Sequence, residues 1–256
     1  MNVREITEVL RREYPEKYFE KWDSAGIQVE FKDRAVRKII VALEADDYVT
    51  DEAVKMGADL IVAHHPLIFS GLKSISDGDV VGRRVMKLVS AGVSLYSMHT
   101  NYDNLFMGRD AAEIMKLTDS EVFIEGMDGY GIGMVGNLPR EMSVSELCGY
   151  VKNVFNLKTV ALYGHKDESV SRVAIVPGSG KEFYPDALKR GANVLITGDV
   201  SHHFGVDAVM SGCSIIDAGH YGLEHIFVDI MGERLERLFK DADIVKILSD
   251  NPIEYI

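Results

Sequence analysis

The chain uses one strand-helix-strand plan twice, and this repeat constrains the fold more than any other feature of the sequence. At a shift of 134 residues, an apolar strand and the helix and strand after it match in two places, 36–41 with 170–175 and 52–62 with 186–196. A third apolar strand follows in each copy, at 93–98 and 213–217, with a shift of about 120. One offset shared by strand and helix indicates an internal duplication, although any two such units have a general likeness.

This repeat predicts an α/β fold of two similar βαβ-based halves, with layered α/β/α sheets. We place the halves at 1–127 and 128–256 and expect the C-terminal helix and strand to pack back on the first. The length of 256 residues suits either one large domain or two of ordinary size.

The first candidate site is the pair His64-His65, which ends the apolar run Leu60–Ala63 and precedes Pro66. The run is short and rich in branched side chains, so it predicts a buried strand with both histidines at its carboxyl end. Ligands collect at that end of an open α/β sheet. Neighbouring strand residues point to opposite sides, so the two imidazoles can serve one site only if the backbone turns. The alternative is a pair of surface or hydrogen-bonded histidines.

Further candidate donors follow later strands. Asp103 comes after the strand 93–98, and His220 and Glu224 come after the strand 213–217. A His and a Glu four residues apart stand on one face of a helix, so both can reach a common ion. Each pattern also has a structural reading, because Asp is a frequent turn residue and His-x-x-x-Glu pairs occur on solvated helix faces.

Together, His64, His65, Asp103, His220 and Glu224 offer three imidazoles and two carboxylates. This donor set favours zinc, iron, manganese, cobalt or nickel over magnesium and calcium, which prefer oxygen ligands. Five donors exceed the need of one open catalytic ion and fit two ions that share a carboxylate. Because the donors come from both halves, we expect a shared metal site between them. Two such ions lower the pKa of a shared water, so hydrolysis is the chemistry we expect.

Composition and missing motifs exclude several other functions. The net charge of −12 argues against non-specific binding to nucleic acid or anionic lipid. The two cysteines, the lack of a long apolar run and the polar start of the chain predict a cytoplasmic protein without membrane spans. No serine-hydrolase elbow, phosphate-cradling loop or dinucleotide fingerprint is present.

Five motifs in order resemble the Nif-three-like dinuclear metal centre family, also called the GTP cyclohydrolase type-two homologue family. They cover almost the whole chain and are Trp22–Val29, Gly57–Leu67, His99–Asp103, Thr197–His203 and Asp217–Glu224. The resemblance implies a two-domain α/β fold, a toroidal homohexamer and two divalent metal ions per chain. It also implies metal ligation at the positions that match His64, His65, Asp103, His220 and Glu224.

The chain departs from the family pattern at two places. Glu44 stands where relatives usually have Asp, and a motif that is commonly Asp-Asn-x-Gly reads Asp23-Ser24-Ala25-Gly26. Neither position belongs to the ligand set, but both can alter what lies beside it.

Two classes of function remain open from the sequence. The first is a metal-dependent hydrolase of a small cyclic or nucleotide-like substrate, with His99 or His203 as proton carriers because histidine titrates near neutrality. The second is a metal-handling protein that stores or delivers ions, or a regulatory protein without catalysis.

Overall fold

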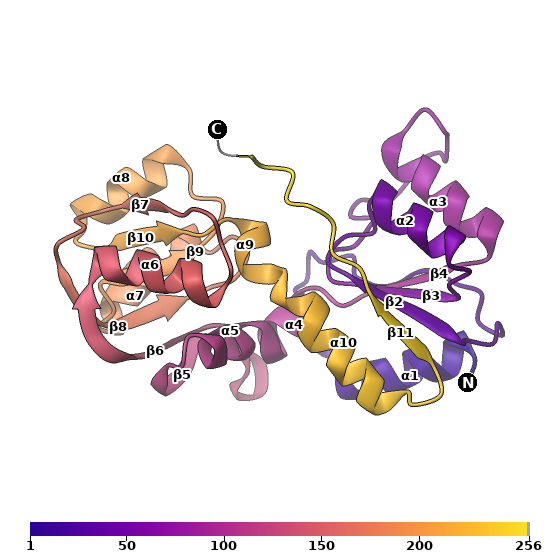
Figure 1. The fold of residues 1–256 in the computed structure, drawn as a ribbon, viewed down its shortest axis with the longest axis horizontal. Helices are drawn as coiled ribbons and strands as arrows, with labels where there is room; N and C mark the ends of the chain where they lie inside the picture. The colour runs from indigo at the N-terminus through magenta and orange to yellow at the C-terminus, as the bar shows by residue number, and fades with distance from the viewer. Residues whose placement is uncertain (255–256) are drawn as a thin grey trace. The chain divides into compact units, whose positions relative to one another are not determined.

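The computed structural model describes residues 1–254, and each of its two units contains its own sheet (Figure 1). The first unit joins Met1–Tyr102 to Phe227–Pro252, and the second contains Asp103–Ile226 and the described residues from Ile253 onward. Helix α10 (Ile226–Leu238) and strand β11 (Asp243–Lys246) thus return the chain to the first unit. The division of the repeat into 1–127 and 128–256 stays a prediction.

The first unit contains a five-stranded sheet in the order β1-β4-β3-β2-β11. Strand β1 (Gly26–Val29) is antiparallel to its neighbour β4, and the other strands are parallel. Those strands are β2 (Lys38–Ala42), β3 (Leu60–Ala63), β4 (Ser94–Ser97) and β11. Every residue of β3 and β4 is buried, as expected for strands covered by helices on both faces. Figure 1 shows α2 and α3 over one face and α1 and α10 over the other.

Polar caps fix where the helices of the first unit begin. Asn2 and Glu5 form a capping box at the start of α1 (Val3–Glu13). The Asp46 side chain accepts the Val49 backbone N–H at 2.8 Å, which starts α2 (Asp47–Lys55). Helix α3 (Val80–Ala91) ends at Gly92, whose φ of 68° suits glycine. The remaining short helices of this unit are η1 (Glu16–Tyr18) and α4 (Thr100–Tyr102).

The second unit contains a six-stranded sheet in the order β5-β6-β8-β9-β10-β7. Its three central strands, β8, β9 and β10, are parallel, and β5, β6 and β7 pair in antiparallel fashion at the two sides. The bounds are β5 (Thr118–Glu125), β6 (Gly131–Ser143), β7 (Ala161–Tyr163), β8 (Ser169–Ile175), β9 (Val194–Thr197) and β10 (Ser214–Asp217).

Short helices connect these strands. They are the π-helical segment η2 (Asp103–Met107), α5 (Gly108–Ile114), η3 (Met127–Gly129), α6 (Val144–Val154), η4 (Lys181–Phe183), α7 (Tyr184–Lys189), α8 (His202–Met210) and α9 (His220–Glu224). Ser143 and Glu146 form a capping box at the start of α6.

Strand register confirms the prediction of two similar α/β halves. Ile39 pairs with Leu60 between β2 and β3, and Val173 pairs with Val194 between β8 and β9, a shift of 134 on both strands. The third parallel strand pairs at Ser94 in the first sheet and at Ser214 in the second, a shift of 120. An antiparallel strand then flanks the third strand in each sheet, β1 in one and β7 in the other.

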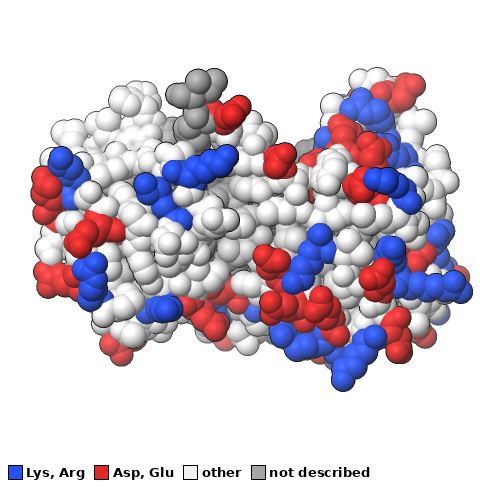
Figure 2. Space-filling view, in the orientation of Figure 1, with Lys and Arg blue, Asp and Glu red and all other residues white. Residues whose placement is uncertain are grey.

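None of the helices in the described part of the chain is both long and apolar enough to cross a membrane. On the face drawn in Figure 2, Lys and Arg side chains lie among Asp and Glu side chains.

Candidate metal centre

His64 and His65 lie directly after β3, where the backbone bends. Their N–H groups donate to the carbonyls of Ala42 at 3.2 Å and Leu43 at 3.0 Å, which ties the bend to the end of β2. The two ring centroids are 4.7 Å apart, and the His64 side chain is fully buried. The bend therefore brings together two side chains that an extended strand would direct to opposite faces.

His99, which follows β4, joins this pair. Its ring centroid lies 5.4 Å from those of His64 and His65. One ring nitrogen from each of the three histidines lies within 4.8 Å of the other two. The sequence suggests His99 as a proton carrier only, whereas this geometry also makes it a candidate ligand.

Each of the three imidazoles uses Nδ1 for a hydrogen bond to a protein acceptor. His64 Nδ1 lies 2.8 Å from the Met98 carbonyl, and His65 Nδ1 lies 2.7 Å from Glu44 Oε1. His99 Nδ1 lies 2.9 Å from Asp23 Oδ1. Carbonyl and carboxylate oxygens only accept, so Nδ1 carries the hydrogen, and in the neutral ring the lone pair is then on Nε2. This is the usual arrangement of metal-ligating histidines, whose other nitrogen donates to a carbonyl or carboxylate.

Asp23 is held as a carboxylate by its surroundings. Burial opposes its charge, but hydrogen bonds from His99 and Thr100 outweigh this effect and lower the Asp23 pKa to about 2. Its oxygens also accept the backbone N–H groups of Ser24 at 2.7 Å and Ala25 at 3.1 Å. Asp23 therefore fixes both the loop after Trp22 and the orientation of the His99 ring.

The second unit presents a similar pattern on α9. His220 Nε2 and Glu224 Oε2 are 2.9 Å apart, one helical turn from each other as the spacing predicts. His220 Nδ1 lies 2.8 Å from Asp199 Oδ2, so this histidine also uses Nδ1 for a carboxylate. The Glu224 side chain is 4% exposed, and a buried carboxylate of this kind is stabilised by a nearby cation.

Gly178 lets the loop after β8 approach this pair closely. A Cβ added there would lie 2.4 Å from Glu224 Oε1 and 3.6 Å from His220 Nε2, and the backbone has a φ of +75°. Both the space and the left-handed conformation require glycine.

Two further predicted residues also lie in the second unit. Asp103 is half-buried and opens the π-helical segment η2, a kind of distortion that is frequent at functional sites. His203 is exposed on α8, with its ring 5.5 Å from that of His202. The roles of Asp103 as a ligand and of His203 as a proton carrier stay predictions.

The sequence does not assign a role to Glu44, Asp23 or Asp199. Glu44 attracts notice only as a departure from a family pattern, and Asp23 and Asp199 only as parts of motifs. Their hydrogen bonds to imidazoles show that all three support candidate ligands or their neighbours.

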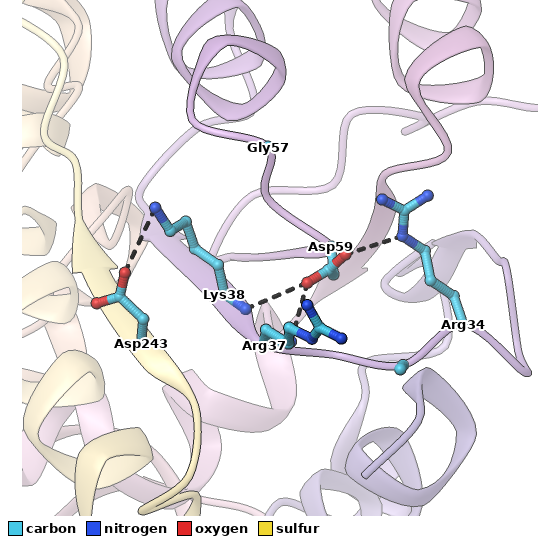
Figure 3. Close-up of a pocket in the computed structure, with 7 residues that line it drawn as sticks. Arg34, Arg37, Lys38, Gly57, Asp59 and Asp243 are labelled. Carbon is cyan, nitrogen blue, oxygen red and sulfur yellow. Dashed lines mark hydrogen bonds and ion pairs between the residues drawn. The ribbon is translucent and has the colours of Figure 1, made fainter.

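A cavity of about 530 Å³ lies at the other end of the first sheet, near the amino ends of β2, β3 and β11 (Figure 3). Asp59, at its centre, accepts hydrogen bonds from Arg34 Nε at 2.9 Å and from the N–H groups of Arg37 and Lys38. Lys38 Nζ is also 3.4 Å from Asp243. Charges here pair mainly with one another, and the cavity contains no imidazole.

Fold and site define an α/β protein with a group of three imidazoles that could hold a metal ion. The model of the Duf34/NIF3 (NGG1p interacting factor 3) family matches residues 1–252, and the chain belongs to this family. The resemblance drawn from the sequence motifs is thereby confirmed.

Two bacterial relatives bear the name "GTP cyclohydrolase 1 type 2 homolog". The protein of Clostridium perfringens is 33% identical over 262 residues, with 100% of both chains covered. That of Clostridium acetobutylicum is 31% identical and covers 92% of this chain and 90% of its own. A crystal structure of a Bacillus cereus protein related to NIF3 has the same fold, with a TM-score of 0.90, 21% identity and coverage of 100% of this chain and 99% of that one.

Proposed function

We propose that the chain binds two divalent transition-metal ions and uses them to hydrolyse a small cyclic or nucleotide-like substrate. The proposed ligands are His64, His65, Asp103, His220 and Glu224. One observation carries the proposal: His64 and His65 each direct Nδ1 to a carbonyl or carboxylate, which orients Nε2 for an ion.

The donors suit such ions chemically. Neutral imidazoles with a lone pair on Nε2 bind zinc, iron, manganese, cobalt and nickel well. The carboxylates of Glu224 and Asp103 add negative charge that offsets the charge of the cations. The names of the relatives support a nucleotide-like substrate, because they refer to a GTP cyclohydrolase.

Bound divalent ions would supply a water of lowered pKa and stabilise negative charge on a substrate oxygen. The chain's own side chains orient the ligands and move protons. Asp23 holds His99 through Nδ1, so His99 Nε2 is the atom we assign to proton transfer. His203 is the second candidate for this task.

Turnover by metal-loaded protein tests the proposal. Protein loaded with manganese, iron or zinc is offered a panel of nucleotides and pterins, and we expect hydrolysis of at least one compound. The His65→Ala variant should lose this activity. His165→Ala, which removes an exposed imidazole outside the site, should keep it. Inertness of fully loaded protein toward the whole panel would contradict a hydrolase.

Metal exchange separates a hydrolase from a metal-handling protein that stores or delivers ions. A catalytic centre retains its ions through many turnovers, so dissociation measured with a chelator should be far slower than turnover. Rapid release to an acceptor protein without any hydrolysis would favour metal handling instead.

The role of His99 has its own test. If His99 carries protons, His99→Ala keeps its full complement of ions and loses most of the hydrolysis rate. Loss of an ion from this variant would make His99 a ligand.

Assembly and location are also proposals. The family resemblance implies a homohexamer, and the polar start and two cysteines of the chain predict a cytoplasmic location. Light scattering coupled to size-exclusion chromatography would give the mass of the assembly directly.

A further inference from the structure

Two large aromatic side chains lie exposed beside the histidine group of the first unit. Trp22 is 60% exposed and Phe69 is 52% exposed, and their ring centroids are 6.1 Å apart with planes tilted by 45°. Exposed aromatic rings in contact are costly in water and favourable once another apolar surface covers them. We call Trp22 and Phe69 the aromatic ledge.

The ledge is continuous with the candidate centre. The Trp22 ring lies 5.9 Å from the ring of His99, nearly perpendicular to it. His99 in turn belongs to the group of three imidazoles whose ring nitrogens lie within 4.8 Å of one another. A molecule that contacts the ledge is therefore beside the histidines that we assign to chemistry.

Hydrogen bonds hold both ledge residues in place. The Ser24 hydroxyl donates to the Phe69 carbonyl, which links the two loops directly. Gln28 Nε2 donates to the Ile68 carbonyl at 3.2 Å, and Gln28 Oε1 accepts the Ile68 N–H at 2.8 Å. On the other side, Asp23 anchors the chain after Trp22 to Thr100. These bonds reduce the entropy that the loops would lose on ligand binding.

We propose that Trp22 and Phe69 hold a planar heteroaromatic ring of the substrate, of the purine or pterin kind, with one aromatic side chain stacked on its face and the other against its edge. This inference rests on the proposed function, because it assigns the part of the substrate that is not hydrolysed. Aromatic faces bind nucleobases by stacking and need no specific hydrogen bonds. The ledge then fixes the ring beside His99, the residue that we assign to proton transfer.

The tryptophan provides its own probe, because it is the only one in the chain. Metal-loaded protein is titrated with guanosine, and fluorescence is excited at the red edge of the indole absorption. We expect saturable quenching by guanosine and none by ribose 5-phosphate, which has no base. In Phe69→Ala the apparent Kd should rise about tenfold, the effect expected for the loss of one stacking partner.

Matched variants show whether the aromatic ledge causes the binding of guanosine. Val89→Ala removes a side chain on α3 that is 50% exposed and should leave the Kd for guanosine unchanged. In calorimetry, Trp22→Ala should bind guanosine more weakly than the parent. Trp22→Phe, which keeps an aromatic face, should recover part of the lost affinity. Both Trp22 variants should retain the metal content of the parent.

Absence of quenching by guanosine would overturn the ledge assignment, as would equal quenching by ribose 5-phosphate. A shift in oligomeric mass in Trp22→Ala without any effect on guanosine binding would assign the ledge to contacts between copies and also overturn the proposal. Failure of the hydrolase proposal gives a different result. If guanosine quenches the fluorescence and ribose 5-phosphate does not, but no compound is hydrolysed, then the ledge assignment stands and only the hydrolase proposal is wrong.

Discussion

The two ends of the first sheet use polar side chains in opposite ways. At the carboxyl ends of β3 and β4, acceptors orient three imidazoles toward one another. At the amino ends, Asp59 and Asp243 pair with the guanidinium and ammonium groups around them. At the carboxyl ends, the imidazoles are oriented for an added cation. At the amino ends, the acidic and basic side chains neutralise one another. Substitutions at the two ends should therefore affect different properties.

The largest effect should come from a direct ligand. In His64→Ala the affinity for a divalent ion should fall by more than about a hundredfold, because even the supporting partners of ligands are worth 10–100-fold. Metal titration followed by elemental analysis measures this. A variant that binds ions as tightly as the parent would show that the carboxyl end does not hold the metal.

Next in size are the partners of the imidazoles. Glu44→Ala removes the acceptor of His65 Nδ1 and should weaken metal binding by about tenfold to a hundredfold. Glu52→Ala, on the neighbouring helix α2, serves as the control and should not change the affinity. Equal affinities for the two variants would mean that Glu44 does not support the site.

At the amino end, Asp59→Ala should reduce stability and leave metal affinity unchanged. The loss of charged hydrogen bonds from Arg34, Arg37 and Lys38 should cost about 2 kcal/mol in the free energy of unfolding. Urea unfolding measures the cost. If metal affinity fell in parallel with stability, the two ends would not be independent.

The same carboxylate gives a pH dependence with a defined sign. Burial opposes the charge of Asp59, but the N–H groups of Arg37 and Lys38 and the Arg34 side chain outweigh it, so its pKa lies below the usual value. A depressed folded-state pKa adds stability that is complete above the unfolded pKa of about 3.9 and is lost as the pH falls through the folded pKa. The difference between parent and Asp59→Ala should therefore shrink below about pH 4. A difference that grew on acidification would contradict this assignment.

The smallest effect should be that of Lys38→Ala. The ion pair of Lys38 with Asp243 spans 3.4 Å, and the Asp243 side chain is 63% exposed. Exposed pairs contribute about 1 kcal/mol or less, and salt screens them. Thermal unfolding at low and high ionic strength measures the contribution, and a loss as large as that of Asp59→Ala would place Lys38 in the structural network around Asp59.

Much of the fold follows from the sequence, because it depends on patterns that repeat along the chain. The 134-residue offset gives the two parallel strand pairs with their register, as Ile39–Leu60 and Val173–Val194 show. Local signals also place His64 and His65 at a strand end and His220 and Glu224 on one helix face.

The supporting shell does not follow from the sequence, because its contacts join distant positions or involve the backbone. Asp23 lies 76 residues before His99, and the partner of His64 is a carbonyl, which every residue has. No pattern in the sequence indicates the π-helical turn that begins at Asp103. The choice of His203 as a proton carrier depends on residue type alone, which does not reveal that it lies exposed on α8.

The central claim is that the proposed ligands, His64, His65, Asp103, His220 and Glu224, hold divalent ions in the natural protein. Elemental analysis of protein purified from its native host tests it most directly, with a His64→Ala variant prepared in parallel. We predict about two transition-metal ions per chain in the parent, the dinuclear count, and a clear loss in the variant. A parent without bound ions, or a variant with the same ion-to-chain ratio, would contradict the account.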